Sequence, residues 1–143
     1  METYSENAAI AVLRLFQAGA RLEERFAASL GAVHGLSLKD ALLLMHVADA
    51  EGGRLSRIEL AKRLSVSPST VTRTTAPLEK LGFLGRESHE RDARFAYVVL
   101  TKAGQRAVAE AEATFERLSA EVFGTGWKRA DVDTLGTLLG RLV

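Results

Sequence analysis

The feature that most constrains this chain is a pair of short helical segments joined by a tight turn, between residues 56 and 81. Ser56 and Glu59 form an S-x-x-E capping box, in which each side chain satisfies a backbone amide of the other residue, so a first helix begins there. Ser67 followed by Pro68 is typical of an N-cap and a first helical residue, and begins a second helix. Two such short helices predict a helix-turn-helix.

Each helix has an apolar face at helical spacing. We expect the buried residues to be Ile58, Leu60, Ala61 and Leu64 in the first helix, Val66 in the turn, and Val71, Leu78 and Leu81 in the second helix, with Thr74 or Thr75 between. The opposite face of the second helix carries Ser69, Thr70, Thr72, Arg73 and Lys80, next to Ser67 at the N-cap. Short hydroxyls and a guanidinium fit the major groove of DNA. A helix that merely faces solvent is the alternative.

Two predicted strands follow the second helix at once. Gly82 is expected to end the helix, and strands over residues 83–87 and 94–100 then flank a polar hairpin tip at residues 88–93. The cations of this ribbon are Arg86, Arg91 and Arg94. A ribbon directly after a recognition helix is a wing, and a cation at its tip reaches the minor groove. The ribbon therefore favours DNA binding over the solvent-facing helix.

Four short motifs carry a resemblance to a known family. They are L-A-K-R-L-S-V-S-P-S-T-V-T-R at residues 60–73, L-E-K-L-G-F-L-G-R at 78–86, D-A-R at 92–94 and L-T-K-A-G at 100–104. With these motifs the chain resembles the MarR-type (multiple antibiotic resistance regulator) winged helix-turn-helix transcription factors over nearly its whole length. The resemblance implies a single domain, 1–143, that is mainly α with a small β-wing. Its DNA-binding part would span about 37–100, flanked by dimerisation helices at about 5–35 and 101–143.

The resemblance also implies roles for wing residues. Asp92 would orient the wing through arginine contacts, with Arg86 as its partner, and Arg94 would enter the minor groove. Pro77 departs from the family pattern, because a proline inside the recognition helix removes the amide that would bond the Arg73 carbonyl and should bend the helix. Pro77 lies past the groove-facing turns, so it affects helix geometry more than DNA contact.

The distribution of charge agrees with DNA as a partner. Residues 54–94 hold nine Lys or Arg against five Asp or Glu, whereas the rest of the chain holds ten against thirteen. The cations thus concentrate on the predicted DNA-binding unit. Because the excess is modest, a dimer that doubles it is expected.

The remaining segments read as helices, with one short strand. A long helix over about 5–30 is closed by Gly31 or Gly35, and a second helix opens at Ser37 and ends at Gly52-Gly53. A partner strand for the wing is expected at residues 54–56. Thr101 caps a helix to about Phe123, and a last helix carries Val132, Leu135, Leu138, Leu139 and Leu142. The terminal helices expose more apolar surface than a small wing covers, which favours a two-fold homodimer over a monomer that packs them internally.

Several other kinds of chemistry find no support in the sequence. The chain has no cysteine, which excludes disulfides, thiolate metal sites and thiol-based sensing. It shows no apolar run of membrane-spanning length and no signal peptide, so a cytoplasmic protein is expected. Without a nucleophile elbow, phosphate loop or metalloprotease motif, neither an enzyme nor a cofactor is expected. His46 and Asp49 have a spacing that suits a metal, but no third ligand lies nearby in sequence.

The family often binds small aromatic or phenolic acids between its helical arms and its winged domain. The residues that would line such a cleft here are Arg14, Phe16, Arg21, Phe26, Met45 and His46. Either arginine would meet a carboxylate, whereas the apolar members are alternatively core residues. The sequence thus predicts a ligand-responsive homodimeric repressor on a pseudo-palindromic operator. The alternatives are a winged-helix module that binds proteins, which Arg73, Arg86 and Arg94 argue against, and a metal- or stress-sensing winged-helix regulator of another family.

Overall fold

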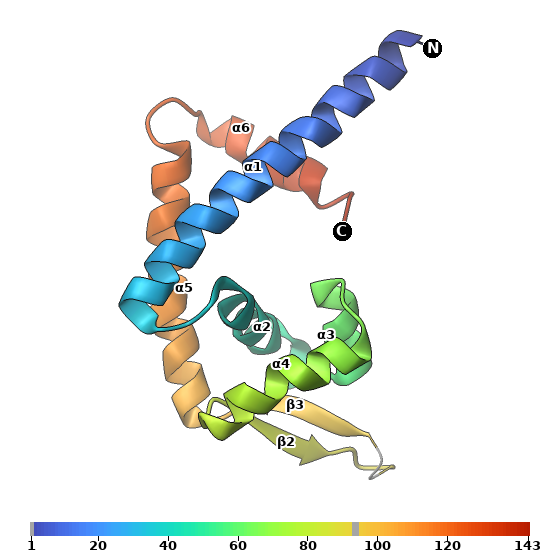
Figure 1. Ribbon diagram of the computed structural model, residues 1–143, viewed down its shortest axis with the longest axis vertical. Coiled ribbons are helices and arrows are strands. Elements are labelled where there is room, and N and C mark those ends of the chain that lie inside the picture. The colour runs from blue at the N-terminus through green and yellow to red at the C-terminus, as the bar shows by residue number, and fades with distance from the viewer. Residues whose placement is uncertain (1, 93–94) are drawn as a thin grey trace.

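Helices form most of the computed structural model, which describes residues 2–92 and 95–143 (Figure 1). In chain order the elements are α1 (Glu2–His34), α2 (Leu38–Asp49), the 3-10 turn η1 (Glu51–Gly53), β1 (Arg54–Ser56), α3 (Arg57–Leu64), α4 (Pro68–Lys80), β2 (Leu84–Ser88), β3 (Ala96–Leu100), α5 (Lys102–Phe123) and α6 (Arg129–Leu139). The predicted class, mainly α with a small β-wing, is confirmed. Ala93 and Arg94 lie outside the described residues, so the predicted minor-groove role of Arg94 stays a prediction.

The three strands form one antiparallel sheet in the order β1-β3-β2. Leu55 pairs with Val98, and Leu84 pairs with Leu100. Leu55, Leu84 and Val98 are buried, so one face of the sheet closes the core. The predicted partner strand at residues 54–56 is confirmed. The wing strands differ slightly from the predicted ranges 83–87 and 94–100: β2 is Leu84–Ser88 and β3 is Ala96–Leu100. Beyond β2, the Phe83 carbonyl accepts the Thr101 amide at 3.1 Å.

The helix starts follow the local capping chemistry that the sequence contains. The hydroxyls of Ser37, Ser67 and Thr101 each accept the backbone amide three residues on, at 3.0–3.2 Å. Ser56 and Glu59 complete a reciprocal capping box at 3.2 and 2.8 Å. These bonds satisfy amides that would otherwise lack a partner at a helix start. All four predicted starts are therefore confirmed.

One predicted helix end is confirmed and another was less accurate. α1 ends at His34 and is closed by Gly35, one of the two glycines predicted to close it, whose φ of +64° suits a residue without a side chain. α2 ends at Asp49, before Gly52-Gly53, because the Ala50 amide already bonds the Val47 carbonyl (3.3 Å). Gly82, with φ +83°, follows α4 as predicted.

One core joins the winged-helix elements to parts of α1 and α5. Its largest fully buried side chains are Leu30, Leu43, Leu44, Val47, Leu60, Val71, Thr75, Leu78 and Val98. Val108 and Ala111 of α5 pack into the same cluster. The helical arms therefore begin inside the winged-helix core, and the boundaries expected near residues 35 and 101 do not divide it.

Three residues predicted to be buried are exposed. Ile58 is 54% exposed in the first turn of α3, where it lies outside the face that carries Leu60 and Ala61. Leu81 is 64% exposed, because it follows the last residue of α4 as a cap. Val66 is also exposed: Ser65 takes a left-handed conformation (φ 54°), and the turn continues along the surface. Those three predictions were wrong.

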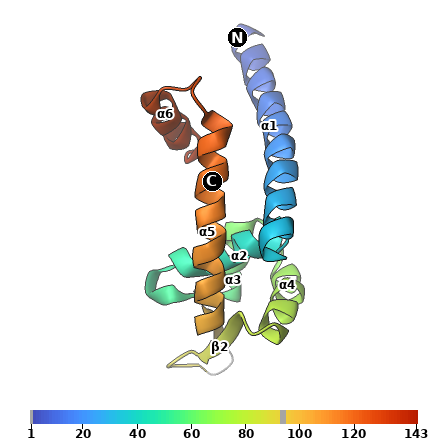
Figure 2. The same cartoon turned by 90° about the vertical axis from the view of Figure 1, so that its left-hand side faces the viewer.

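The terminal helices extend away from this core (Figures 1 and 2). Among the residues that the structure describes, α6 contains no buried side chain. Figure 2 shows α1 and α6 separated, with α5 between them. The exposed apolar residues of these helices and their ends include Tyr4, Ile10, Leu13, Phe16, Trp127, Leu138, Leu139 and Leu142. No described helix is long and apolar enough to cross a membrane.

Candidate nucleic-acid interface

The recognition helix α4 separates its buried and exposed faces cleanly. Val71, Thr75 and Leu78 are buried, while the side chains of Ser69, Thr72, Arg73 and Lys80 are exposed. Thr74 is half-buried, so Thr75 is the threonine that completes the core face. The helix continues past Pro77 and ends at Lys80. The polar face that the sequence predicted is therefore available to a partner.

The hydroxyls at the start of α4 form a connected network. The Ser67 hydroxyl lies 3.0 Å from that of Ser69 and 2.9 Å from that of Thr70. Arg73 donates from Nη2 to the Thr70 hydroxyl at 3.4 Å. The N-cap thus fixes the helix start and orders the polar groups beside it, including the guanidinium expected to reach a base edge or a phosphate.

Thr101 and Gly104 attach the wing to α5, which gives a physical basis for the L-T-x-x-G motif. The Thr101 hydroxyl donates to the Gly82 carbonyl, and it also accepts the Gly104 amide. A Cβ on Gly104 would lie 2.0 Å from the Phe83 carbonyl oxygen, a distance that no side chain tolerates. This close approach requires glycine, and it fixes the end of α4 against the start of α5.

The outer face of the sheet carries a contiguous set of charged and aromatic side chains. Arg54 of β1 donates to Glu87 of β2 at 2.7 Å, and its guanidinium lies 4.7 Å from the centre of the Tyr97 ring. His89 stacks on Tyr97 with 5.4 Å between ring centres, and its Nδ1 accepts the Arg91 amide at 3.1 Å. This set, Arg54, Glu87, His89 and Tyr97, connects the body of the domain to the wing tip.

Arg86 connects the wing to the recognition helix. It donates from Nε to Glu79 of α4 at 3.1 Å, an ion pair in which Arg86 is half exposed. The family resemblance implies Asp92 as the partner of Arg86, and the sequence pattern does not identify Glu79. Arg91 is exposed near the wing tip, where a cation was expected. The role of Asp92 as wing organiser stays a prediction.

Sequence reasoning also missed Arg57, which lies at the recognition surface. This residue begins α3, yet its Nη1 donates to the Thr72 hydroxyl of α4 at 3.1 Å. No motif marks an arginine at that position. Arg57 does follow the capping serine directly, so it lies in the first turn of the helix that precedes α4, a placement that could have indicated its reach.

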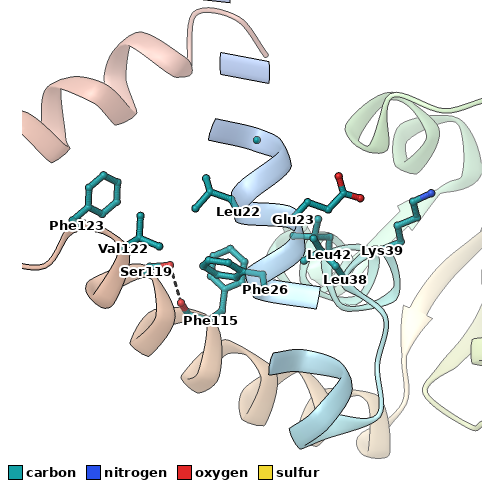
Figure 3. Close-up of a pocket in the computed structure, with 11 residues that line it drawn as sticks. Leu22, Glu23, Phe26, Leu38, Lys39, Leu42, Phe115, Ser119, Val122 and Phe123 are labelled. Carbon is teal, nitrogen blue, oxygen red and sulfur yellow. Dashed lines mark hydrogen bonds between the residues drawn. The ribbon is translucent and has the colours of Figure 1, made fainter. Parts of the chain in front are cut away.

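A separate apolar cavity of about 490 Å³ lies between α1, α2 and α5 (Figure 3). It is lined by Gly19, Leu22, Glu23, Phe26, Leu38, Lys39, Leu42, Phe115, Ser119, Val122 and Phe123. Phe26 and Phe115 meet edge to face with 4.7 Å between ring centres. Glu23 and Lys39 are the charged residues of the lining. The cavity thus offers aromatic walls with charges of both signs.

Of the six residues predicted to form a ligand pocket, Phe26 lines this cavity. Phe16 is 75% exposed on α1, and Arg14 and Arg21 are also exposed there. Met45 packs against the core. His46 is half-buried, and its carbonyl accepts Arg63 at 3.4 Å. The five residues other than Phe26 therefore lie outside the cavity, because α1 turns them to other sides or α2 packs them inward.

His46 has an environment that favours its neutral form. Burial lowers the pKa of the imidazole, the nearby Arg63 lowers it further, and Asp49 acts in the opposite direction. Within residues 2–92 and 95–143, no group of three His, Asp or Glu side chains could hold a metal ion. His34 joins α1 to α5, with its Nε2 2.7 Å from the Thr114 hydroxyl.

Comparison with known proteins identifies the family. A model described as the MarR family matches residues 34–94. The HTH-type transcriptional repressor YetL of Bacillus subtilis (strain 168) is 35% identical over 111 residues. The aligned segment makes up 76% of this chain and 66% of that repressor, so the chain spans about two thirds of its relative's length.

The chain belongs to the MarR family of transcriptional regulators. Solved structures share the fold of this MarR-family chain. Sco3205 of Streptomyces coelicolor, solved in complex with DNA, has a TM-score of 0.82 at 22% identity, over 94% of this chain and 87% of that one. BldR of Sulfolobus solfataricus has a TM-score of 0.74 at 24% identity, over 92% and 96%. The predicted family and fold are confirmed.

Proposed function

We propose that this MarR-family regulator represses transcription as a homodimer bound to a pseudo-palindromic operator. The observation that carries the proposal is the exposed polar face of α4, with Ser69, Thr72 and Arg73, beside a wing that presents Arg86 and Arg91. Hydroxyls and a guanidinium on such a helix reach base edges in the major groove. The relative YetL is a repressor, and Sco3205 was solved with DNA; both support the assignment. DNA binding also supports the cytoplasm as the site of action.

The apolar surface of the terminal helices supports the proposed homodimer. Leu138, Leu139 and Leu142 are exposed at the C-terminal end, and Leu13 and Phe16 are exposed on α1. Burial of such residues against a second copy removes their apolar area from water, which stabilises the assembly. A two-fold dimer places two copies of α4 about 34 Å apart, one helical turn of DNA, to meet successive major grooves.

Salt-dependent DNA binding is the direct test. Fluorescence anisotropy is measured with a duplex enriched from a random pool and with a scrambled duplex. We expect tight binding to the enriched duplex, with an affinity that falls steeply as salt rises. A winged-helix module that binds only proteins would show no such dependence. Membership of the MarR family already argues against a sensor from another winged-helix family.

A small aromatic or phenolic acid is the proposed effector of the cavity between α1, α2 and α5. The aromatic walls of Phe26 and Phe115 suit a ring, and Lys39 supplies a cation for a carboxylate. A ligand there contacts both the arm helices and α2, so it can alter the spacing of the two recognition helices. This effector is a proposal from the shape and chemistry of the cavity.

Calorimetry with 4-hydroxybenzoate tests the effector site. We expect saturable binding that a cavity-filling Val122→Phe substitution abolishes, together with weaker DNA binding when the acid is present. Val33→Phe, at an exposed position of α1 outside the cavity, is the matched control. Binding that survives Val122→Phe unchanged would place the acid elsewhere.

A further inference from the structure

Arg57 lies at the recognition surface although it belongs to the preceding helix. It begins α3, and α3 packs against α4 in the helix-turn-helix (Figure 1). Its guanidinium donates to the hydroxyl of Thr72 at 3.1 Å. Thr72 is exposed and directly precedes Arg73. Two arginines from different helices therefore lie at the same polar face.

The Thr72 hydroxyl is already engaged within the protein. It donates its proton to the Pro68 carbonyl at 3.3 Å and accepts a bond from Arg57 at 3.1 Å. A threonine hydroxyl has one proton and two lone pairs. The proton is thus used inside the helix, and the remaining groups that Thr72 can present to DNA are a lone pair and its methyl group.

Arg57 keeps most of its hydrogen-bonding capacity. A guanidinium has five N–H groups, and one of them is used on Thr72. In a helix-turn-helix the first helix crosses the phosphate backbone while the second enters the major groove. In that geometry, a cation fixed at the first turn of α3 and directed toward α4 would lie beside a phosphate that flanks the groove. Thr72 holds the side chain in position, which reduces the rotamer freedom lost on binding.

We propose that Arg57 is a phosphate-contacting residue aimed by Thr72, and that Thr72 reads a thymine through its methyl group and not through its hydroxyl. The proposal rests on the proposed DNA-binding function. It gives the two groups of the Thr72 side chain different roles. The methyl group makes an apolar contact with a base, and the hydroxyl positions a cation from the neighbouring helix. Apolar contact with the thymine methyl is an established mode of base discrimination.

Two Arg57 variants test the phosphate contact. For Arg57→Ala we expect similar losses of affinity on the enriched and the scrambled duplex. The slope of log affinity against log salt should fall by about 0.9 per subunit, the change for one lost phosphate contact. Arg57→Lys should restore the slope in part. Arg129→Ala removes the same charge from α6, where the side chain is almost fully exposed, and should change neither quantity.

Two Thr72 variants test the division of roles. Thr72→Val keeps a methyl group and loses the hydroxyl, so base preference should persist while affinity falls on every duplex. Thr72→Ser keeps the hydroxyl and loses the methyl, so discrimination at one thymine position should fall while the salt slope stays unchanged. Circular dichroism and thermal unfolding of each variant verify that the fold is intact.

The outcomes that overturn the proposal differ from those that overturn DNA binding. An unchanged salt slope for folded Arg57→Ala would exclude the phosphate contact. Base preference lost in Thr72→Val but kept in Thr72→Ser would show that the hydroxyl reads the base. If the unmodified protein showed no salt-dependent binding to any duplex, the proposed function itself would be wrong.

Discussion

The winged-helix part and the helical arms of this protein differ in where their apolar residues lie. In the winged-helix part, side chains such as Leu44, Leu60 and Leu78 are fully buried within one subunit. Along α6 and most of α1 the apolar residues lie at the surface. The first part has a core that is closed within one subunit. The arms expose apolar residues of the kind that mark contact sites, which supports the proposed dimer.

This difference determines how the contribution of each residue to stability should depend on protein concentration. A residue of the closed core contributes to the free energy of unfolding at any protein concentration. In the proposed dimer an arm residue contributes only when a second copy covers it, so its effect on stability should depend on protein concentration. α5 belongs to both parts, since Val108 and Ala111 join the core while its far end carries Phe123 toward the cavity.

Disruption of the arms should have the largest effect on function. Replacement of Leu138 and Leu142 by aspartate places two charges where a second copy should pack. We expect a monomer by light scattering and a loss of about 10²- to 10⁴-fold in affinity for a two-half-site duplex, because the second contact is no longer intramolecular. Thr137→Asp, an exposed polar position of α6, is the control. A double variant that remains dimeric and binds normally would refute this interface.

A core substitution should cost about 2–5 kcal/mol of unfolding free energy, the range for a large-to-small change at a buried leucine. Leu44→Ala removes a side chain that is 1% exposed, whereas Leu142→Ala removes one that is 68% exposed. Urea unfolding at several protein concentrations distinguishes them. The Leu44→Ala cost should be present at each concentration, and the Leu142→Ala cost should vanish under dilution to monomer. Equal costs for both variants in the monomer would contradict the comparison.

Removal of Arg73 should cost about 1–3 kcal/mol of DNA-binding free energy and relax preference at one or two base pairs if the residue reads a base. The reason is its placement on the exposed face of α4, oriented by the Thr70 hydroxyl at 3.4 Å. Anisotropy with Arg73→Ala across single-base variants of the duplex measures both quantities. Arg106→Ala on α5 is the charge-matched control. A uniform loss across all sequences would assign Arg73 to a phosphate instead.

The parts of this fold that depend on near neighbours in sequence could be predicted. The four caps at Ser37, Ser56, Ser67 and Thr101 bond the amide three residues on, so short motifs suffice to find them. Gly82 and the exposed face of α4 were likewise predictable. These features follow from helix geometry alone.

Features set by tertiary contact could not be read from the sequence. The pairing of Arg54 with Glu87 and Tyr97 depends on the register of three strands. Arg57 reaches Thr72 only once α3 and α4 are packed. Ile58, Val66 and Leu81 were predicted to be buried for the same reason, and they are exposed. Apolar character at helical spacing does not say whether another element covers a residue.

Loss of the α3 cap should cost about 1 kcal/mol of unfolding free energy. Ser56→Ala removes the acceptor for the Glu59 amide, and Glu59 then loses its own fixed geometry. Hydrogen bonds from the Ser56 amide and, second, from the Ser56 hydroxyl hold the pKa of Glu59 below its ordinary value, so the carboxylate stabilises the fold at neutral pH and loses this contribution as pH falls through the acid range. Ser88→Ala, at the exposed end of β2, is the control. An unchanged Glu59 pKa in the Ser56→Ala protein, measured by NMR, would contradict the assignment.

The smallest effect should be the pH dependence that His46 adds to the closed part of the molecule. Because burial lowers the pKa of His46 from its ordinary value of 6.5, the unfolded chain takes up this proton before the folded protein does. The associated stability is complete above pH 6.5 and declines as pH falls toward the lower folded pKa. His46→Gln should therefore flatten the slope of unfolding free energy between about pH 7 and pH 5. His34 and His89 remain in both proteins, so the difference between the two slopes isolates His46. The effect should be the same in dimer and monomer, because His46 packs within one subunit. A slope difference that appeared only at high protein concentration would place His46 at the interface and weaken the division between closed core and open arms.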